Sequence, residues 1–318
     1  MIWQPSASIE NLKARARLLA NIRQYFANNN VLEVETPLLC SYGVTDRYMR
    51  SIQTHNFFST KDLPGFLQTS PEYAMKRLLA SGSGDIFQIC KAFRQDEAGA
   101  RHNPEFSLLE WYRVGFDEKQ LMDDVFQLLV TVLPQHKLEM CSYHSVFDNM
   151  LSIDPLSIDG HELEHFALEQ LGDLPQGLDR DDYLSLLFED KIEPQLGKNQ
   201  TITFVTDFPA SQAALARINS QDSRVACRFE VYIEGVELAN GFYELADDKL
   251  QIERFERDNK WRQENGLETI EIDHFFIDAL KYGLPDCSGV ALGIDRLLMI
   301  MLEEQSLDKV LSFPFDRI

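Results

Sequence analysis

The sequence predicts an α+β fold built from antiparallel strand pairs and amphipathic helices. Residues 86–113 and 228–245 each contain two runs of alternating apolar residues around a polar connection, which is the pattern of a β-hairpin. Residues 8–28 repeat apolar side chains at the spacing of an α-helix. These stretches place both kinds of secondary structure along one chain.

Composition restricts the class of protein. The chain has 318 residues, 44% hydrophobic and 25% charged, which is ordinary for a globular protein with a sizeable core. No apolar run approaches the roughly 20 residues of a membrane helix, and the N-terminus lacks a signal-peptide layout. Five widely spaced cysteines without a CxxC pair favour reduced thiols in the cytoplasm over a disulfide framework or zinc site. The net charge of −21 argues against a large nucleic-acid-binding surface.

The N-terminal segment predicts one helix and one strand. Ser8 can cap the helix of residues 8–28, and the asparagines at 28–30 end it. Residues 31–37 predict a strand that Pro37 terminates. A plain helix–strand unit is the simplest interpretation of this segment.

Further helices follow from local signals. Pro71 suits the first turn of a helix, where Glu72 also interacts favourably with the helix dipole. Residues 118–133 and the charged stretch 251–266 predict two more helices.

The hairpin of residues 86–113 carries side chains that suit a nucleotide. Its first strand ends in Arg94, and an arginine can hold a phosphate with two parallel donors. Because strand side chains alternate, the second strand puts four residues on one face: Phe106, Leu108, Glu110 and Tyr112. The loop carries Asp96, Glu97, Arg101 and His102. On these properties alone, a surface hairpin with a charged loop is the simpler interpretation.

Residues 140–200 are helical, acidic and interrupted by turn signals. They contain His161 and His165 in the H-E-x-x-H pattern of zinc proteases. Helical geometry puts Leu163 and Ala167 on one face and both histidines on the opposite, solvent side. No third ligand is evident in the sequence, so we expect no zinc site.

The hairpin of residues 228–245 presents paired carboxylates. A two-residue turn at 234–235 puts Tyr232 opposite Glu237 and Glu230 opposite Ala239, so the two glutamates become diagonal neighbours. Two close carboxylates repel unless a cation lies between them, and oxygen ligands suit Mg²⁺. A solvated acidic face is the alternative.

The same hairpin predicts a bulge. Asn240, Phe242 and Glu244 alternate in opposite parity to Glu237. To share one pocket with it, they need a bulge near residues 239–241. The glycine at 241 is compatible with such a bulge.

Residues 286–296 form a glycine-rich turn that leads into an apolar helix. Asp295 can cap this helix, and Arg296 with the free amides of the helix start can bind an anion. A buried helix after a glycine-rich turn is the alternative.

Three segments together resemble the motifs of class II aminoacyl-tRNA synthetases, in the form found in lysyl-tRNA synthetases. Residues 8–37, with their final Glu-Thr-Pro, are similar to motif 1, which implies a homodimer. Residues 93–106, Phe-Arg-x-Asp followed by Arg-His-Asn-Pro-Glu-Phe, resemble motif 2, although the family has Arg-x-Glu where Asp96 stands with Glu97 beside it. Residues 293–296, Gly-Ile-Asp-Arg, resemble motif 3.

The resemblance implies a class II catalytic core, an antiparallel β-sheet flanked by helices. It covers nearly the whole chain, so we expect one catalytic domain over residues 1–318 with a helical, acidic insertion at about 140–200. Only the helix of residues 8–28 precedes the strand of motif 1, and we therefore expect no anticodon-binding domain.

The resemblance also implies the site residues. The catalytic residues are Arg94 and Arg296. The ATP-binding residues are Arg94, Asp96, His102, Asn103, Phe106, Glu237, Gly293 and Arg296. The residues that contact a lysine-like substrate are Ser70, Glu72, Glu110, Tyr112, Asn240, Phe242, Glu244 and Ala291. The ligands of Mg²⁺ are Glu230 and Glu237.

One substitution separates this chain from the tRNA-charging enzymes. Ala291 stands where lysyl-tRNA synthetases have glycine in Gly-x-Gly-x-Gly-x-Asp-Arg, and a methyl group there reshapes the amino-acid pocket. With the expected lack of an anticodon domain, this resembles the bacterial lysyl-tRNA synthetase paralogues that attach (R)-β-lysine to elongation factor P. The resemblance implies an ATP-dependent ligase with elongation factor P, not tRNA, as its partner.

Two alternatives stay open. One is a truncated lysyl-tRNA synthetase or another class II amide-forming ligase, such as an asparagine synthetase. The other is a regulatory paralogue that has lost catalysis. The joint presence of Arg94, Glu230, Glu237 and Arg296 speaks against lost catalysis.

Overall fold

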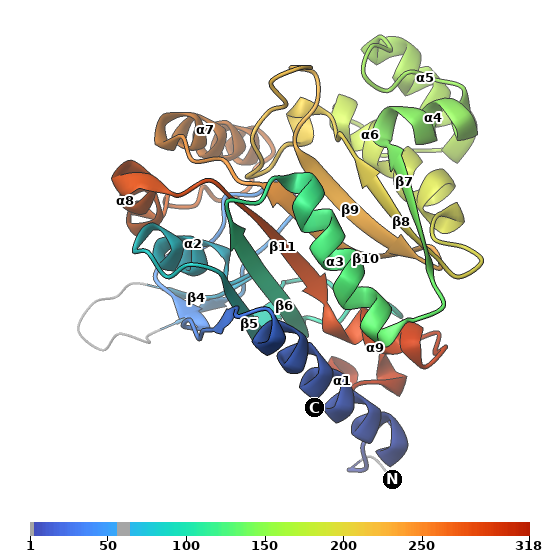
Figure 1. Cartoon of the computed structure of the whole chain (residues 1–318). Helices are drawn as coiled ribbons and strands as arrows, with labels where there is room; N and C mark the ends of the chain where they lie inside the picture. Colours follow the sequence, from blue (N-terminus) through green and yellow to red (C-terminus); the bar gives the residue numbers. More distant parts are fainter. Residues whose placement is uncertain (1–2, 56–63) are drawn as a thin grey trace. The chain divides into compact units, whose positions relative to one another are not determined.

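The computed structural model describes residues 3–55 and 64–318 of the chain. The chain divides into two compact units, of which unit 1 comprises Met1–Phe116 and Leu245–Ile318 and unit 2 comprises Asp117–Glu244. Unit 2 is thus inserted into the sequence of unit 1. Each unit has its own strands and helices (Figure 1).

Unit 1 is built around the first predicted hairpin. Its strands lie in the order β1 (Leu32–Glu33), β5 (Ile86–Phe93), β6 (Glu105–Val114) and β11 (Cys287–Gly293). β5 and β6 are antiparallel along their whole length, as the sequence predicts. β11 pairs with the other edge of β6, also antiparallel, and places Ala291 opposite Glu110. A smaller sheet has the order β2 (Leu39–Cys40), β4 (Gly65–Leu67) and β3 (Gln53–Thr54).

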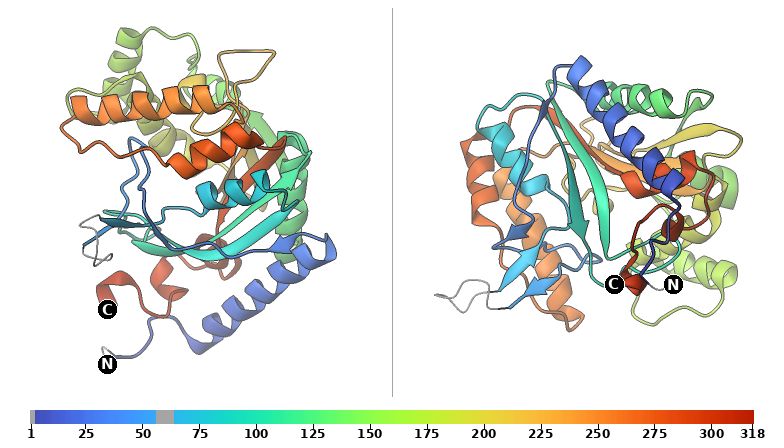
Figure 2. Two further views of the ribbon diagram at one scale, coloured as in Figure 1. Left: turned by 90° about the vertical axis from the view of Figure 1, so that its left-hand side faces the viewer. Right: turned by 90° about the horizontal axis from the view of Figure 1, so that it is seen from below.

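Helix α1 (Ile9–Asn28) covers one face of the sheet formed by β1, β5, β6 and β11 (Figure 2). Ser8 caps it as predicted, because its hydroxyl accepts a hydrogen bond from a backbone N–H of the first turn at 3.0 Å. Phe26 stacks on Phe87 of β5 with ring centroids 4.3 Å apart, and it meets Trp111 of β6 edge-on at 5.4 Å. Strand residues of the other parity therefore face away from α1.

The opposite face of β5 and β6 lies toward α2 (Glu72–Ala80) and α8 (His274–Gly283). Tyr73 of α2 stacks on Phe276 of α8, with ring centroids 4.5 Å apart and nearly parallel planes. The remaining elements of unit 1 are α7 (Asp248–Glu264), α9 (Ile294–Met301) and the short 3₁₀ segments η4 (Leu307–Lys309) and η5 (Phe315–Arg317).

Unit 2 is built around the second predicted hairpin. Its strands lie in the order β10 (Val236–Tyr243), β9 (Arg228–Ile233), β8 (Thr201–Thr206) and β7 (Lys137–Ser142). Its helices are α3 (Glu118–Val132), α4 (Tyr143–Leu151), α5 (Gly160–Leu171), α6 (Arg180–Leu187) and the short segments η1 (Phe188–Ile192), η2 (Glu193–Gln195) and η3 (Ala210–Gln212). An aromatic core joins helices to strands, with Tyr143 stacked on Phe188 at 5.3 Å and Tyr232 packed against the same cluster.

The strands are mixed rather than purely antiparallel, which corrects one detail of the predicted sheet. β1 is parallel to β5, and β7 is parallel to β8. In both cases a long connection joins the two strands, with α2 between β1 and β5 and with α4, α5 and α6 between β7 and β8, and such crossovers are what parallel pairing requires. The local alternation that predicts a strand carries no information about the direction of a distant partner.

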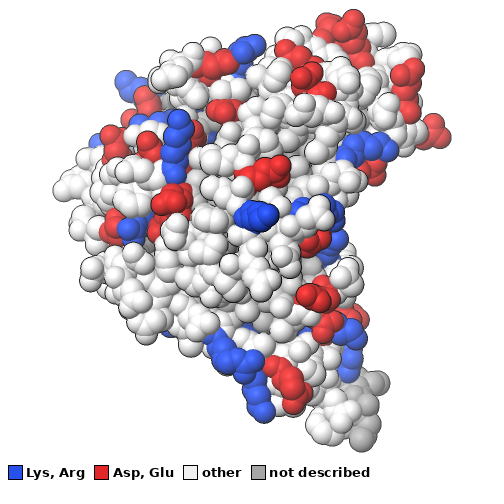
Figure 3. All heavy atoms as spheres, turned by 45° about the vertical axis from the view of Figure 1, so that its right-hand side comes forward, with Lys and Arg blue, Asp and Glu red and all other residues white. Residues whose placement is uncertain are grey.

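Helix α5 behaves as its periodicity predicts. Leu163 and Ala167 are buried in the core of unit 2, whereas His161 and His165 are exposed. Among the described residues, no helix combines the length and apolar character needed to cross a membrane. On the face drawn in Figure 3, the basic side chains of the described residues are scattered among acidic ones.

Candidate active site

The face of β6 that turns away from α1 carries the residues predicted from strand alternation. Glu110 on this face is 2% exposed, and hydroxyl groups donate to both of its carboxylate oxygens. Ser70 Oγ donates to Oε2 at 2.8 Å, and Tyr112 Oη donates to Oε1 at 2.7 Å. The predicted substrate residues Ser70, Glu110 and Tyr112 therefore form one hydrogen-bonded group.

Burial sets the protonation of Glu110. Loss of solvent, helped by the nearby charge of Glu72, raises the pKa of Glu110 from 4.5 to about 8. The hydrogen bonds from Tyr112 and Ser70 and the charge of Lys76 lower this pKa, but they do not offset burial. A positive group that binds beside Glu110 would stabilise its ionised form, which is the property expected of an ammonium site.

Glu72, in the first turn of α2, is a second carboxylate near Glu110, and these two glutamates form the acidic group of unit 1. The backbone N–H of Glu72 donates to Ser70 Oγ at 3.0 Å, and Glu72 Oε1 accepts from Lys76 Nζ at 2.6 Å. Lys76 was not among the residues predicted for the site. The i, i+4 spacing of Glu72 and Lys76 was the available signal, but it also describes an ordinary solvent-exposed helix pair.

Ala291 lies on the same face. It pairs with Glu110 across β11 and β6, and directly opposed residues of an antiparallel pair have Cβ atoms about 5 Å apart on one side of the sheet. The methyl group of Ala291 is therefore next to the acidic group, where the resemblance places it.

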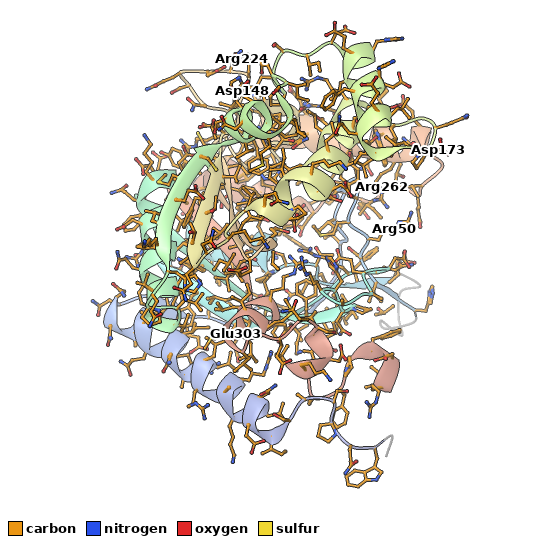
Figure 4. The ribbon with its side chains drawn as sticks, turned by 90° about the vertical axis from the view of Figure 1, so that its right-hand side faces the viewer. Arg50, Asp148, Asp173, Arg224, Arg262 and Glu303 are labelled. Carbon is orange, nitrogen blue, oxygen red and sulfur yellow. The ribbon has the colours of Figure 1, made fainter. Side chains whose placement is uncertain are left out.

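The motif 2 segment holds Arg94 beside an aromatic ring. The Arg94 guanidinium carbon lies 5.0 Å from the centroid of Phe106, in a cation–π contact. Glu97 lies 3.6 Å from Arg94, whereas Asp96 lies 3.3 Å from Arg50, which is labelled in Figure 4. Asp96 has a φ of 65°, a left-handed conformation that turns its side chain differently from that of Glu97. Of the two candidate acids, Glu97 is thus the one beside Arg94.

Arg296 of α9 contacts His102, which lies in the loop between β5 and β6. Arg296 Nη2 lies 2.8 Å from His102 Nε2, and its Nε donates to the backbone oxygen of Arg101 at 3.3 Å. Since a guanidinium can only donate, a hydrogen bond in this contact requires His102 to accept through Nε2. The two residues predicted for the outer phosphates are therefore adjacent.

Asn103 uses both ends of its side-chain amide locally. Nδ2 donates to the backbone oxygen of Glu105 at 2.6 Å, and Oδ1 accepts from the backbone N–H of Phe315 at 2.9 Å. In this arrangement the amide connects the loop to the C-terminal segment.

Asp295 does not cap α9, which corrects the prediction. The N-cap residue is Gly293, and Asp295 is buried in the first turn. The Asp295 carboxylate accepts from Arg15 Nη1 at 2.6 Å and from the backbone N–H of Ser107 at 2.7 Å. A charged partner from α1 outcompetes the local cap, because a charge-assisted hydrogen bond is stronger than a neutral one.

The hairpin of unit 2 contains the predicted bulge. Tyr232 pairs with Glu237 as expected, but the register then shifts between Glu237 and Ala239, so that Asn240 rather than Ala239 is opposite Glu230. The bulge lies slightly earlier than residues 239–241. It brings Glu230, Glu237 and Asn240 to the same face of the hairpin, as the prediction required.

Close packing explains why residue 241 is a glycine. A Cβ atom there would lie 2.3 Å from Cζ of Phe229, which is fully buried. Phe242, the next residue, pairs with Arg228 and packs against a small alanine cluster. Glu244 directly follows the strand and is also buried.

Glu230 is held by several donors. Arg228 and the hydroxyl of Tyr232 both donate to its carboxylate in short contacts, and Asn240 Nδ2 donates at 3.3 Å. Burial raises the pKa of Glu230; Arg228 opposes this rise, and Glu237 adds to it. Arg228 was not predicted for the site, because an arginine at a strand start has no distinctive pattern.

The paired glutamates fit Mg²⁺. Their charges disfavour each other, which is the condition that a divalent cation relieves. Within the described ranges, no group of three or more His, Cys, Asp or Glu side chains is arranged to hold a metal ion. Mg²⁺ nevertheless suits two carboxylates, because it commonly takes one or two from the protein and completes its shell with waters and phosphate oxygens.

Comparison with known proteins agrees with the motifs. The family model described as tRNA synthetases class II (D, K and N) matches residues 3–317. The Elongation factor P–(R)-beta-lysine ligase of Histophilus somni (strain 2336) is 50% identical over 316 residues, which cover 99% of this chain and 98% of that protein. The proteins of the same name from Vibrio atlanticus (strain LGP32) and Hamiltonella defensa are 50% and 49% identical, with the same coverage.

Proposed function

Because this chain belongs to the class II tRNA synthetase family of the D, K and N enzymes, we propose that it is an ATP-dependent, AMP-forming ligase. Its amino-acid substrate is (R)-β-lysine, and its acceptor is a lysine side chain of elongation factor P. The name shared by relatives that are about 50% identical over nearly their whole length supports this substrate pair. The observation on this chain that carries the proposal is the buried Glu110 carboxylate beside Glu72, a group suited to an ammonium ion.

The amino-acid substrate carries two ammonium groups, and the proposal assigns carboxylates to them. In unit 1, Glu72 and Glu110 bind an ammonium, with Ser70 and Tyr112 orienting Glu110. For Asn240, Phe242 and Glu244 of unit 2, the motif resemblance supports a role in binding the amino acid. Buried carboxylates are appropriate because a buried charge is tolerated only when it is paired. Ala291 adds a methyl group where it can discriminate between amino-acid shapes.

ATP is bound by positive and aromatic side chains. Arg94 holds the α-phosphate, His102 and Arg296 hold the outer phosphates, and Phe106 stacks on adenine. The backbone of Gly293, at the start of α9, adds an anion-binding amide terminus. Glu230 and Glu237 would hold Mg²⁺, which neutralises phosphate charge when it is bound.

The reaction then has two steps. The substrate carboxylate oxygen attacks the α-phosphorus and pyrophosphate leaves, which Arg94 and Arg296 favour by neutralising charge that develops on the phosphates. The acceptor amine next attacks the carbonyl carbon of the adenylate and AMP leaves. The acceptor amine, with an ordinary pKa near 10.4, must lose a proton before its attack, and the adenylate phosphate is the proposed base.

A second candidate is a lysine-activating enzyme that charges tRNA, because the family model includes such enzymes. The net charge of −21 favours the protein acceptor over a polyanionic one.

ATP–pyrophosphate exchange with α-lysine and (R)-β-lysine, followed by transfer to elongation factor P or to tRNA, tests the proposal. We expect exchange with (R)-β-lysine, transfer to elongation factor P, and loss of both with Arg94→Ala. Exchange with neither amino acid would refute a ligase, and efficient tRNA charging would favour the second candidate.

We further propose that the enzyme is a cytoplasmic homodimer that pairs through its motif 1 segment. Ile9 and Leu32 of that segment are each 55% exposed in the single chain, which leaves apolar surface for a partner. Sedimentation equilibrium of the full chain tests the dimer, and a monomer at micromolar concentration would refute it.

A further inference from the structure

Lys76 lies beside the acidic group of unit 1 but has no role in the reaction proposed above. It is fully buried on α2, one turn after Glu72. Its Nζ donates to Glu72 at 2.6 Å and lies 5.8 Å from the ring centroid of Phe276. A buried ammonium is costly unless carboxylates match it, so Lys76 and the acidic group depend on each other.

The charges of this cluster can be counted. Glu72 and Glu110, when both are ionised, carry two negative charges, and Lys76 supplies one positive charge. Ser70 links the Glu110 carboxylate to the backbone of Glu72, because its hydroxyl donates to Glu110 and accepts from the backbone N–H of Glu72. One unmatched negative charge therefore remains, in a geometry set by hydrogen bonds.

We propose that Lys76 is a positioning residue of the amino-acid site, which orients Glu72 and leaves the Glu72–Lys76–Glu110 cluster with the charge that binds one ammonium group. The inference rests on the proposed function, since it takes a diamino acid as the substrate. Lys76 acts through the two glutamates and does not touch the reacting atoms.

The charges of this cluster should affect how kcat/KM for the amino acid depends on pH. The groups that face Glu110 are Glu72 and Lys76 from α2, Ser70 before it, Tyr112 from β6 and Cys90 from β5. Lys76 favours the ionised form of Glu110, so its removal raises the pKa of Glu110 further. The substrate ammonium binds the ionised form, and the acidic limb of kcat/KM for the amino acid then moves to higher pH.

The test compares Lys76→Met with Arg77→Met in pyrophosphate exchange between pH 6 and 9.5. Arg77 is a matched control, because it follows on the same helix, is exposed, and lies over the Phe275 ring at 5.1 Å. For Lys76→Met we expect the amino-acid KM to rise about tenfold and the acidic limb to move up by about one pH unit, with the KM for ATP within about twofold. We expect neither change in Arg77→Met.

An unchanged acidic limb in Lys76→Met, or an equal rise in both KM values, would overturn the role of Lys76. If that variant does not fold, Glu72→Gln and Glu72→Gln/Lys76→Met carry the test. Glu72→Gln should lower the acidic limb, and adding Lys76→Met should raise it again by about one pH unit. No difference between these two variants would also overturn the proposal.

Pyrophosphate exchange by the wild-type protein distinguishes failure of the proposed function from failure of the role of Lys76. If it exchanges pyrophosphate with no diamino acid, the proposed function fails, and the role of Lys76 fails with it. If it exchanges normally and the Lys76 variants keep the wild-type profile, only the role of Lys76 fails.

Discussion

Replacing Arg15 with methionine should destabilise unit 1 far more than an ordinary surface substitution. Arg15 Nη1 lies 2.6 Å from Asp295, and Nη2 donates to Ser107 Oγ at 2.6 Å. These contacts join α1 to α9 and β6, the elements that carry Arg296 and Phe106. Asp295 is 2% exposed, so its carboxylate has little access to solvent when the guanidinium is removed.

The expected magnitude follows from this burial. Removing one partner of a buried ion pair costs about 3–5 kcal/mol, because the other charge stays buried without compensation. The Arg15 side chain is 18% exposed, and Asp295 keeps its hydrogen bond from the backbone of Ser107. Both facts reduce the penalty, and we expect a loss of ~2–3 kcal/mol in the free energy of unfolding.

Arg23→Met is the matched control on the same helix. Arg23 pairs with Glu33 at 2.9 Å, but their side chains are 47% and 41% exposed. An exposed pair contributes about 0–1 kcal/mol. The two substitutions therefore remove the same chemical group from α1 and differ in the burial of its partner.

Tryptophan fluorescence during urea unfolding measures the difference. Trp3, Trp111 and Trp261 all belong to unit 1, so the signal reports that unit. With a slope of about 2 kcal/mol per molar urea, Arg15→Met should lower the midpoint by about 1–1.5 M and Arg23→Met by less than about 0.5 M. Equal shifts in the two variants would refute the reasoning that burial of Asp295 makes this pair important.

Three further predictions use the same logic. The pKa of Glu110 is raised from 4.5 to about 8, so the stability that its protonated form contributes is full below pH 4.5 and is lost as pH rises from there through 8. Glu110→Gln should therefore flatten the fall of the urea midpoint between about pH 5 and pH 8, and an unchanged fall would contradict the assignment. Gly241→Ala should destabilise unit 2 by ~1–3 kcal/mol, because the new Cβ would meet buried Phe229. Amide hydrogen exchange in the β9–β10 hairpin measures this loss, and the control Gly160→Ala, where the new Cβ has open space, should show none. Ala291→Val should raise the amino-acid KM at least about tenfold and leave that for ATP unchanged, and a parallel rise in both would contradict its place beside Glu110.

Much of this protein follows from local sequence alone. The hairpin of residues 86–113, the face that carries Glu110 and Tyr112, and the exposure of His165 depend only on periods of two and 3.6 residues. The parity of Asn240 and Glu237 predicts a bulge in the second hairpin on the condition that the two share a face, and the structure has it between Glu237 and Ala239.

The tertiary structure decided which distant groups meet. Arg15 reaches Asp295 across 280 positions, and Ser70 reaches Glu110 across 40. The direction of β1 and β7, the donors around Glu230 and the choice of Glu97 beside Arg94 are likewise set by packing and loop geometry. Periodicity states which way a side chain points, but the partner it finds there depends on how the whole chain folds.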